Sequence, residues 1–359
     1  YLRRQNRPNI SALAPTVPPP LVDSANTLGL RERTTYDGAI IEPVEPLQAF
    51  IERHLASFAN AESVAICLLH AYANPTHERA LEAALEAIHP HLNITLSSEL
   101  VPLTREYERA LTTVANAFVA PRMQAYLEDL SALFPHTDIA IMDSAGGLIP
   151  VDDAAAEPVR TALSGPAGGV RGARRVADQL AAGSILALDM GGTSTDISII
   201  ERTLLPSSEG RVGHLPLRTP MLPIETVGAG GGSIAFIDDG GILKVGPQSA
   251  GALPGPAAYG LGGAHATVTD AHVVLGRLPS LLGGEMDLDA QAAHAAVEAI
   301  ARKLDTTIEQ AALGIVEIAT ANIVRACKRI LMERGVDPRT LSLVAFGGTG
   351  GLHACDVAR

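Results

Sequence analysis

The spacing of apolar residues along the chain predicts an alternation of strands and helices. A β-branched apolar run at 62–72 is typical of a buried strand, and 91–100 returns as a second one. Between them, 74–88 repeats its apolar residues at helical spacing. This order favours a mixed or parallel sheet covered by helices. By the same criteria we expect further helices at 46–59, 106–133, 164–181, 289–304 and 307–333, and further strands at 39–41, 138–144, 184–190, 197–200 and 341–346.

Three stretches depart from this regular pattern. Pro121 lies inside the helical stretch 106–133 and is expected to end or kink that helix, because proline lacks an N–H and its ring clashes with the preceding turn. Glycine-rich loops are expected to dominate 205–263, and the weak periodicity of 1–45 indicates extended connections.

Composition excludes several classes of protein. The chain has 359 residues, enough for two or three domains that each bury a core. Its net charge is −12, and its lysines and arginines form no dense run. Both observations argue against nucleic-acid binding, which needs a basic surface. Every apolar run is shorter than the ~20 residues of a membrane span. The three cysteines, Cys67, Cys327 and Cys355, lack the spacing of a disulfide framework or a zinc site. We therefore expect a cytoplasmic protein.

Both ends of the sequence resemble interior sequence. The first residues contain no methionine and enter a proline-rich stretch, and the last nine have the pattern of a helix that has just begun. Charged residues make up 18% of the chain, against about 25% in typical domains, which indicates a surface covered by a partner or by further chain. We therefore expect a piece of a longer protein.

The strongest local signal is the segment 189–196, Asp-Met-Gly-Gly-Thr-Ser-Thr-Asp, between two predicted strands. A strand–turn–strand is not a Walker P-loop, which needs a following helix and a Gly-Lys-Ser/Thr ending. Glycine amides can approach an anion closely, threonine hydroxyls add donors, and the two aspartates suit a metal ion or its water. The pattern favours phosphate or nucleotide handling, and an ordinary tight hairpin is the alternative.

Two other glycine-rich segments are candidates for the same kind of site. The segment 346–353 has the pattern of a strand, a glycine turn and a helix start, where amide dipoles favour phosphate. Such turns are also common packing devices. The glycines of 228–233 would allow either approach to a nucleotide or substrate, or tight packing of backbone.

The remaining candidates carry weaker signals. Asp270 lies near His265 and His272 in a region that we expect to be loop, where these side chains would position a substrate or metal, or simply be solvated. The charged run 105–109 is typical of a solvated, salt-bridged helix face. Cys327 and Cys355 are expected to be inert small apolar residues, and His353 to cap or pack.

Seven segments together resemble the ATP-dependent hydantoinase/oxoprolinase family, the hydantoinase A-type subunit, which includes N-methylhydantoinase A and acetone carboxylase β-like chains. This family lies within the actin/Hsp70/sugar-kinase ATPase superfamily. The segments are YANPTHERALE (72–82), LSSELVPLTREYERALTTVANAFV (96–119), RTALSGPAGGVRGA (160–173), LALDMGGTSTDISII (186–200), ETVGAGGGSIAFID (225–238), VGPQSAGALPGPAAYGLGGAHATVTDAHVVLGRL (245–278) and AFGGTGGLHA (345–354).

The resemblance implies an α/β, actin/Hsp70/sugar-kinase-like ATPase fold, with the second lobe largely present and the first incomplete. Residues 1–110 would be the C-terminal part of the N-terminal domain, and 111–359 an ATPase domain truncated at its C-terminus. Family members begin with a further phosphate loop like 189–196, which this sequence does not contain. Local departures from the family pattern are Ala258 for cysteine, His272 for asparagine, Thr349 for alanine and Gly351 for proline.

The resemblance also implies ATP and Mg²⁺ as cofactors. Asp189, Asp196 and Asp270 would be catalytic, with Asp189 and Asp196 also holding the metal. Substrate would meet His265 and His272. The nucleotide would contact Gly191, Gly192, Thr193, Ser194, Thr195, Gly347, Gly348, Thr349 and Gly350.

The implied reaction is ATP-dependent ring opening of a cyclic amide, such as a hydantoin, N-methylhydantoin or 5-oxoproline, through phosphorylation of the amide carbonyl oxygen. An acetone- or acetophenone-type carboxylase subunit and a non-catalytic ATP-binding remnant are the alternatives. A hydantoinase B-type subunit, separate or fused, would be the partner within an oligomer. We expect this piece alone to be inactive, because it carries a single phosphate loop.

Overall fold

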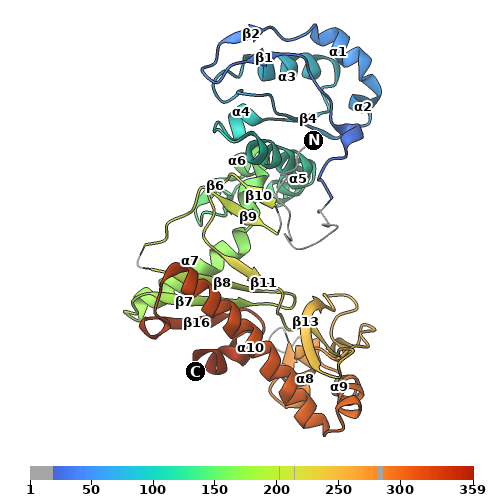
Figure 1. The fold of residues 1–359 in the computed structure, drawn as a ribbon, viewed down its shortest axis with the longest axis vertical. Helices are drawn as coiled ribbons and strands as arrows, with labels where there is room; N and C mark the ends of the chain where they lie inside the picture. The colour runs from blue at the N-terminus through green and yellow to red at the C-terminus, as the bar shows by residue number, and fades with distance from the viewer. Residues whose placement is uncertain (1–18, 202, 214, 282–285) are drawn as a thin grey trace. The chain divides into compact units, whose positions relative to one another are not determined.

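The computed structural model describes residues 19–201, 203–213, 215–281 and 286–359, which form a mixed α/β protein (Figure 1). The chain divides into two compact units. Unit 1 contains the residues up to Ala167 together with Leu205–Leu222, and unit 2 contains Gly168–Leu204 together with Pro223–Arg359. Unit 1 thus extends past the predicted boundary between 110 and 111. The assignment of the two predicted domains to ATPase lobes stays a prediction.

Unit 1 is built around the parallel strands β3 (Ser63–Ile66) and β4 (Asn93–Leu96), which helix α3 (Thr76–Ile88) connects. The predicted strand–helix–strand order is confirmed. Both strands are shorter than predicted: β3 ends at Ile66, and the end of 91–100 forms the short helix α4 (Ser97–Leu100). Phe50 and Leu85 pack in the apolar core beneath them. The smaller elements are η1 (Ser24–Asn26), β1 (Arg33–Thr34), β2 (Ile40–Glu42), α1 (Leu47–Arg53) and α2 (Leu55–Ala59).

The long helix α5 (Glu106–Leu133) packs on this strand pair, and the Asn116 amide donates to the Thr95 hydroxyl at 3.2 Å. The helix continues through Pro121, which does not end it. Burial of Ala117 and Leu127 on either side holds the helix together there. Unit 1 is completed by β5 (Ala140–Met142), β6 (Leu148–Pro150), α6 (Val151–Ala156), η2 (Pro158–Thr161), β9 (Gly210–Val212) and β10 (Leu215–Leu217).

Unit 2 contains a sheet with the strand order β11–β8–β7–β16. Its strands are β7 (Ile185–Met190), β8 (Thr195–Ile200), β11 (Glu225–Val227) and β16 (Ser342–Phe346). β7 pairs antiparallel with β8 and parallel with β16, as expected of a central strand with a continuous apolar sequence. Helix α10 (Ile308–Arg334) covers the sheet, with Ile323 packed in the same core as Leu188 (Figure 1).

A second core of unit 2 lies among the helices α8 (Val268–Val274), α9 (Ala290–Leu304) and α10. Loops dominate 205–263 as expected, although they are interrupted by short strands. Short strand pairs form between the glycine turns there, among them β12 (Ser233–Ile237) and β13 (Leu243–Ser249). The remaining elements of unit 2 are α7 (Ser164–Gln179), which begins in unit 1, η3 (Ala257–Tyr259), β14 (Ser280–Leu281), β15 (Met286–Asp287), η5 (Pro338–Thr340) and α11 (Gly350–Ala358).

The two long helices near the end of the chain form as predicted, and each begins at a side-chain cap. Asp289 accepts a hydrogen bond from the Ala292 amide at the start of α9. Thr307 and Gln310 form a reciprocal capping box at the start of α10.

Across the described residues, no single helix is long and apolar enough to cross a membrane. The pair α9–α10 meets that test only jointly, and it is bent by 92°.

Candidate functional site

The segment 189–196 forms a hairpin in unit 2, so the predicted strand–turn–strand is confirmed. Asp189 on β7 stands opposite Asp196 on β8, and Met190 stands opposite Thr195. The Gly191 amide donates to the Ser194 carbonyl at 3.1 Å and closes the turn. Because residues directly opposite in an antiparallel pair share one face, the two aspartates project to the same side of the sheet.

The glycine loop 228–233 packs directly on the tip of this hairpin. The Gly231 amide donates to the Gly191 carbonyl at 3.0 Å, and the Gly232 amide donates to the Gly192 carbonyl at 2.6 Å. A Cβ atom on Gly230 would lie 2.7 Å from the Gly192 carbonyl oxygen. These glycines therefore permit backbone to pack against backbone, which was one of the two interpretations of this segment.

The second predicted glycine loop, 347–350, meets the hairpin from the other neighbouring strand. The Thr349 hydroxyl donates to the Met190 carbonyl at 3.1 Å and to the Gly191 carbonyl at 3.0 Å. Gly347 has a φ of +83°, and a Cβ atom there would lie 2.4 Å from Oδ1 of Asp189. The structure thus brings the segments 189–196 and 347–350 together, with Gly347 against the Asp189 carboxylate and Thr349 against the hairpin backbone.

The electrostatics of the hairpin suit a cation. Partial burial and the charge of Asp196 raise the pKa of Asp189 above its ordinary value. Oδ1 of Asp196 accepts a hydrogen bond from the Thr226 hydroxyl at 2.5 Å. The described residues contain no group of three metal-binding side chains. Two carboxylates fit Mg²⁺ that completes its coordination with phosphate and water, and Gly192 and Gly348 keep the site exposed.

Asp270 lies on helix α8 and not in a loop as expected, and its carboxylate is completely buried. Oδ1 accepts from the Ala258 amide at 2.8 Å, and Oδ2 accepts from the Thr267 amide at 2.9 Å, which makes a capping box at the start of the helix. Burial raises the pKa of Asp270 despite these hydrogen bonds. These contacts show that the carboxylate caps α8 and holds the segment at Ala258. Its catalytic role stays a prediction.

The two histidines predicted to contact substrate differ in their exposure to solvent. His265 is exposed in a loop, whereas His272 is completely buried on α8. Nε2 of His272 lies 3.2 Å from Nε2 of His353, whose Nδ1 lies 2.8 Å from the Thr320 hydroxyl. Burial lowers the pKa of His272 to about 3 and that of His353 to about 4. The packing role expected of His353 agrees with this geometry, and substrate contact by His265 and His272 stays a prediction.

Sequence reasoning missed the contribution of α8 to the hairpin region. The Thr269 hydroxyl donates to the Gly231 carbonyl at 2.9 Å, so the start of α8 supports the glycine loop that supports Gly191. No sequence signal marks this contact, because its partners are separated by 38 positions.

The charged run 105–109 is only partly the solvated face that we expected. Arg105 is exposed and pairs with Glu209 at 2.9 Å. Arg109 is completely buried, and it donates to the Leu68 carbonyl at 2.7 Å and to the Ser97 hydroxyl at 3.1 Å. It satisfies groups that follow the carboxyl ends of β3 and β4, a need that the charge pattern alone does not reveal.

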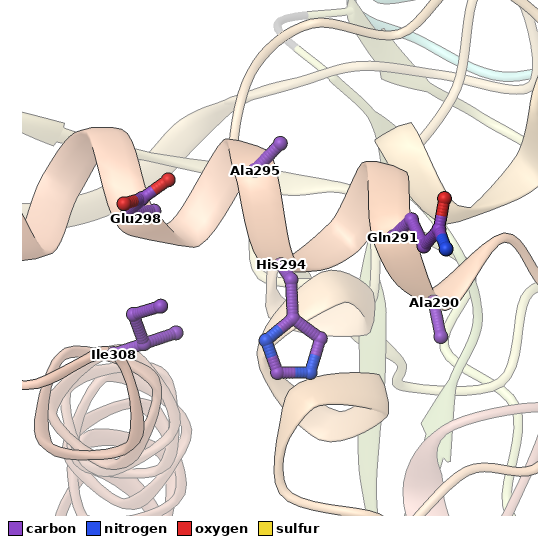
Figure 2. A pocket seen from close by; sticks show the side chains of 6 residues that line it. All are labelled: Ala290, Gln291, His294, Ala295, Glu298 and Ile308. Carbon is purple, nitrogen blue, oxygen red and sulfur yellow. The ribbon is translucent and has the colours of Figure 1, made fainter.

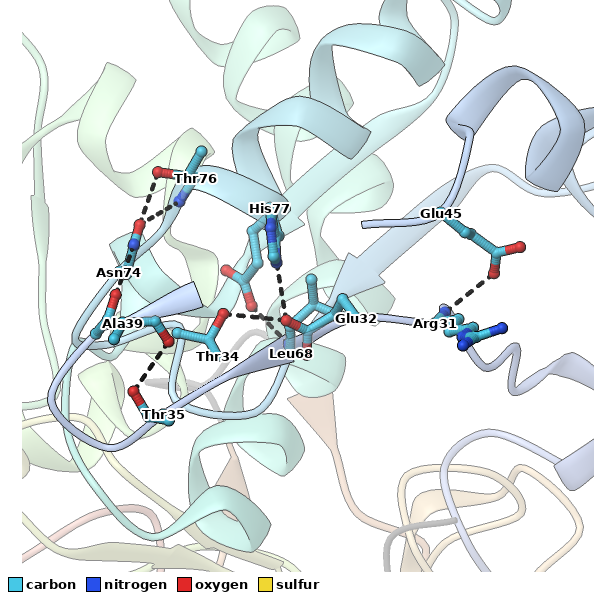
Figure 3. A network of polar contacts seen from close by, with 12 residues as sticks. Arg31, Glu32, Thr34, Thr35, Ala39, Glu45, Leu68, Asn74, Thr76 and His77 are labelled. Carbon is cyan, nitrogen blue, oxygen red and sulfur yellow. Dashed lines mark hydrogen bonds and ion pairs between the residues drawn. The ribbon is translucent and has the colours of Figure 1, made fainter. Parts of the chain in front are cut away.

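Two other features of the surface and interior lie apart from these residues. In unit 1, Glu32 accepts hydrogen bonds from the His77 ring at 2.8 Å and from the Thr34 hydroxyl at 3.1 Å, which ties β1 to α3 (Figure 3). In unit 2, α9 and the start of α10 border an open pocket of about 390 Å³ (Figure 2). It is lined by Ala290, Gln291, His294, Ala295, Glu298 and Ile308. It therefore coincides with none of the predicted site residues.

Comparison with known proteins identifies the family of this chain. The hydantoinase/oxoprolinase profile matches residues 109–359, and the profile of the hydantoinase/oxoprolinase N-terminal region matches residues 1–89. The chain belongs to the hydantoinase/oxoprolinase family. The resemblance inferred from the sequence motifs is thereby confirmed.

Several members of this family are similar over most of the chain. The caprolactamase subunit alpha of Pseudomonas jessenii is 38% identical, over 91% of this chain and 48% of the relative. The 5-oxoprolinase of Saccharomyces cerevisiae is 37% identical, over 83% of this chain and 24% of the relative. A nucleotide-free structure of acetone carboxylase matches with a TM-score of 0.82 and 29% identity, over 96% of this chain and 51% of that one. The chain thus spans about half or less of the length of these proteins.

Proposed function

We propose that the protein containing this chain is an ATP-dependent hydrolase that opens a cyclic amide, with the hairpin 189–196 handling the phosphates. The observation that carries the proposal is the convergence of two glycine loops, 228–233 and 347–350, on the tip of a hairpin that carries a pair of carboxylates. The hairpin tip is held by 228–233 on one side and by Thr349 on the other, while Asp189 and Asp196 share one face. A tight hairpin needs neither the paired acids nor the two supporting loops.

Each residue has a task in this proposal. Asp189 and Asp196 would hold the magnesium ion. Backbone amides within Gly191–Thr195 would hold phosphate oxygens, apart from the Gly191 amide, which closes the turn on the Ser194 carbonyl. Residues 347–350 would lie near the adenosine. ATP, when bound, supplies the phosphoryl group that turns a poorly electrophilic amide carbonyl into one that water can attack. Fixed donors and charges that are already oriented before reaction supply most of the acceleration in such chemistry.

The finer predictions belong to the same proposal. The fold would be that of the actin/Hsp70/sugar-kinase ATPases, a hydantoinase B-type subunit would be the partner, and the assembly would be cytoplasmic. Residues 1–359 alone are expected to bind ATP weakly, because a second phosphate loop would have to come from outside the sequence. Isothermal calorimetry tests this, and sub-micromolar affinity of the isolated chain for ATP would contradict it.

A carboxylase subunit is the second candidate, and the high structural similarity to acetone carboxylase favours it. The two functions differ in their co-substrate. We expect the complete protein, with its partner subunit, to release ADP in the presence of hydantoins, lactams or 5-oxoproline without bicarbonate. ADP release that requires both a ketone and bicarbonate would select the carboxylase. No ADP release with either panel would support a non-catalytic ATP-binding remnant.

A further inference from the structure

Unit 2 buries two histidines that have no task in the reaction proposed above. His272 lies on α8 and His353 on α11, and both side chains are completely buried. Nε2 of one ring lies 3.2 Å from Nε2 of the other, and the ring planes are 82° apart, so one ring meets the other edge-on. Burying two polar rings is costly unless their nitrogen atoms find partners, so this contact needs an explanation.

The partners of the two rings fix the positions of their protons. Burial lowers both pKa values well below neutrality, so each ring is neutral and carries one N–H donor and one acceptor nitrogen. The Thr320 hydroxyl donates its only proton to the Val316 carbonyl at 2.9 Å, and it therefore accepts from Nδ1–H of His353 at 2.8 Å. Nε2 of His353 then accepts from Nε2–H of His272.

The opposite order of protons is less favourable. Nδ1 of His272 is buried and has no partner among the described residues. In the order given above this atom is an acceptor without a donor, whereas the reverse order would bury an N–H without an acceptor, which native proteins tolerate less. A chain of hydrogen bonds thus runs from α8 through α11 to Thr320 on α10.

One end of this chain lies next to the glycine loop 228–233. His272 follows Thr269 by three positions, so the two side chains lie on the same side of α8. The amide and the hydroxyl of Thr269 both donate to the Gly231 carbonyl, at 2.7 and 2.9 Å. The position of His272 is therefore linked, through one turn of helix, to the loop that supports Gly191.

His353 has the same relation to the loop 347–350. It follows Thr349 by four positions, and the Thr349 amide donates to the Met190 carbonyl at 3.0 Å. The two loops also meet each other, because a Cβ atom on Gly231 would lie 2.8 Å from Oγ1 of Thr269 and 2.8 Å from Cγ2 of Thr349. The helices α8 and α11 thus meet at Gly231 and again, one turn further along each helix, at the two histidines.

We propose that His272 and His353 are positioning residues for the nucleotide site. Their contact, completed by Thr320, holds α8 and α11 at the separation at which both glycine loops grip the tip of the hairpin 189–196. They act through Thr269 and Thr349 and not by touching substrate. This inference rests on the proposed function, because the separation of the loops matters for ATP only if the hairpin binds it.

Two substitutions at one position test the role in the reaction. His272→Leu removes the donor, whereas His272→Gln keeps an amide nitrogen that reaches about as far as Nε2 of histidine. In the complete protein with its partner subunit, we expect His272→Leu to raise the KM for ATP about tenfold and to change kcat less than about threefold, because the loops hold the nucleotide equally in the ground and transition states. His272→Gln should restore the wild-type KM. An unchanged KM in a folded His272→Leu protein, or no restoration by His272→Gln, would overturn the inference.

Hydrogen exchange tests the same contact without any reaction. We expect peptides that contain 228–233 and 347–350 to exchange at least about tenfold faster in His272→Leu, while the central strand β7 keeps its slow exchange because the sheet stays folded. Equal exchange of both loops in the wild type and in His272→Leu would overturn the inference. If the complete protein releases no ADP with any substrate, the proposed function fails, and the exchange measurement still decides whether the histidines hold the loops.

Thr320→Val tests the other end of the chain if His272→Leu does not fold. It keeps the shape of the side chain, removes the acceptor of His353 Nδ1–H, and should speed exchange in the same two loops. Thr113→Val is the matched control, because the Thr113 hydroxyl is also buried in a helix and donates to the carbonyl four positions back, at 2.9 Å. It lies in unit 1 and should leave both loops unchanged. Unchanged exchange in Thr320→Val would overturn the inference.

Discussion

Asp189 and Asp196 stand directly opposite each other on the antiparallel strands β7 and β8, and partial burial together with the charge of Asp196 raises the pKa of Asp189. Like charges opposite each other in a sheet are destabilising. A protein keeps such a pair where a cation or a proton is needed between them. The position of this pair at the base of a glycine turn supports metal and phosphate handling.

The first prediction concerns the glycine that touches Asp189. Gly347→Ala should destabilise the protein by roughly 2 kcal/mol or more, because alanine is strained at a φ of +83° and its Cβ would lie 2.4 Å from Oδ1 of Asp189. Gly348→Ala is the matched control, since nothing lies within 4 Å of its added Cβ. Urea unfolding measures both. Equal stability of the two variants would contradict the described contact.

The second prediction follows from the raised pKa of Asp189. The folded state binds this proton more tightly than the unfolded state, so stability falls as the pH rises from the ordinary value of 3.8 through the raised pKa. Asp189→Asn should therefore raise the melting temperature at pH 7 and lose that advantage below pH 3.8. Asp239→Asn, at an exposed position, serves as the control. A lower melting temperature of Asp189→Asn at pH 7 would count against the electrostatic account.

The third prediction concerns the buried pair His272 and His353. Burial lowers their pKa values to about 3 and about 4, so below pH 6.5 the unfolded chain takes up protons that the folded chain excludes. Stability should fall as the pH drops from 6.5 towards 4, by up to about 1.4 kcal/mol per pH unit for each histidine. The nearby charges are Arg277, which opposes protonation of both rings, and Asp356, which favours that of His353.

Removing one member of this pair isolates its contribution. His272→Asn should make the loss of stability in acid less steep, whereas the control His265→Asn, at an exposed position nearby, should leave it unchanged. Urea unfolding at several pH values between 4 and 7 measures the slope. The same slope in the wild type and in His272→Asn would show that the buried ring does not titrate as described.

The fourth prediction separates structure from catalysis at Asp270. Asp270→Ala should cost about 3 kcal/mol, because it leaves the buried amides of Ala258 and Thr267 without an acceptor. Asp289→Ala removes an exposed helix cap that accepts from a single amide, and it should cost about 1 kcal/mol. Thermal or urea unfolding compares them. Equal costs would argue that Asp270 is held for chemistry and not for its buried hydrogen bonds.

Much of the fold could be predicted because its signals are local. The apolar run of β7, the glycine turn and the β-branched run of β8 specify a hairpin within sixteen positions, 185–200. The caps and apolar periods of α9 and α10 likewise lie inside each helix. The glycine turns at 189–196 and 347–350 could be predicted for the same reason, since each carries its own pattern, whereas their role as a nucleotide site stays a proposal.

What could not be predicted depends on contacts between distant segments. Arg109 lies in a charged run yet is completely buried, because it satisfies the Leu68 carbonyl 41 positions away. His272 meets His353 across 81 positions. Of the two effects predicted for Pro121, the structure excludes the end of α5, and a kink there stays a prediction. For Arg109 and His272, tertiary packing overrides the local pattern.

The central claim is that the hairpin 189–196 handles the phosphates in this family member. The most direct measurement is ADP release by the complete protein with its partner subunit and a cyclic amide, compared between the wild type and Asp189→Ala. We expect the variant to keep the fold, as judged by circular dichroism, and to lose about a hundredfold or more of the substrate-dependent rate. Asp239→Asn should keep the wild-type rate. Unchanged turnover in a folded Asp189→Ala protein would contradict the account.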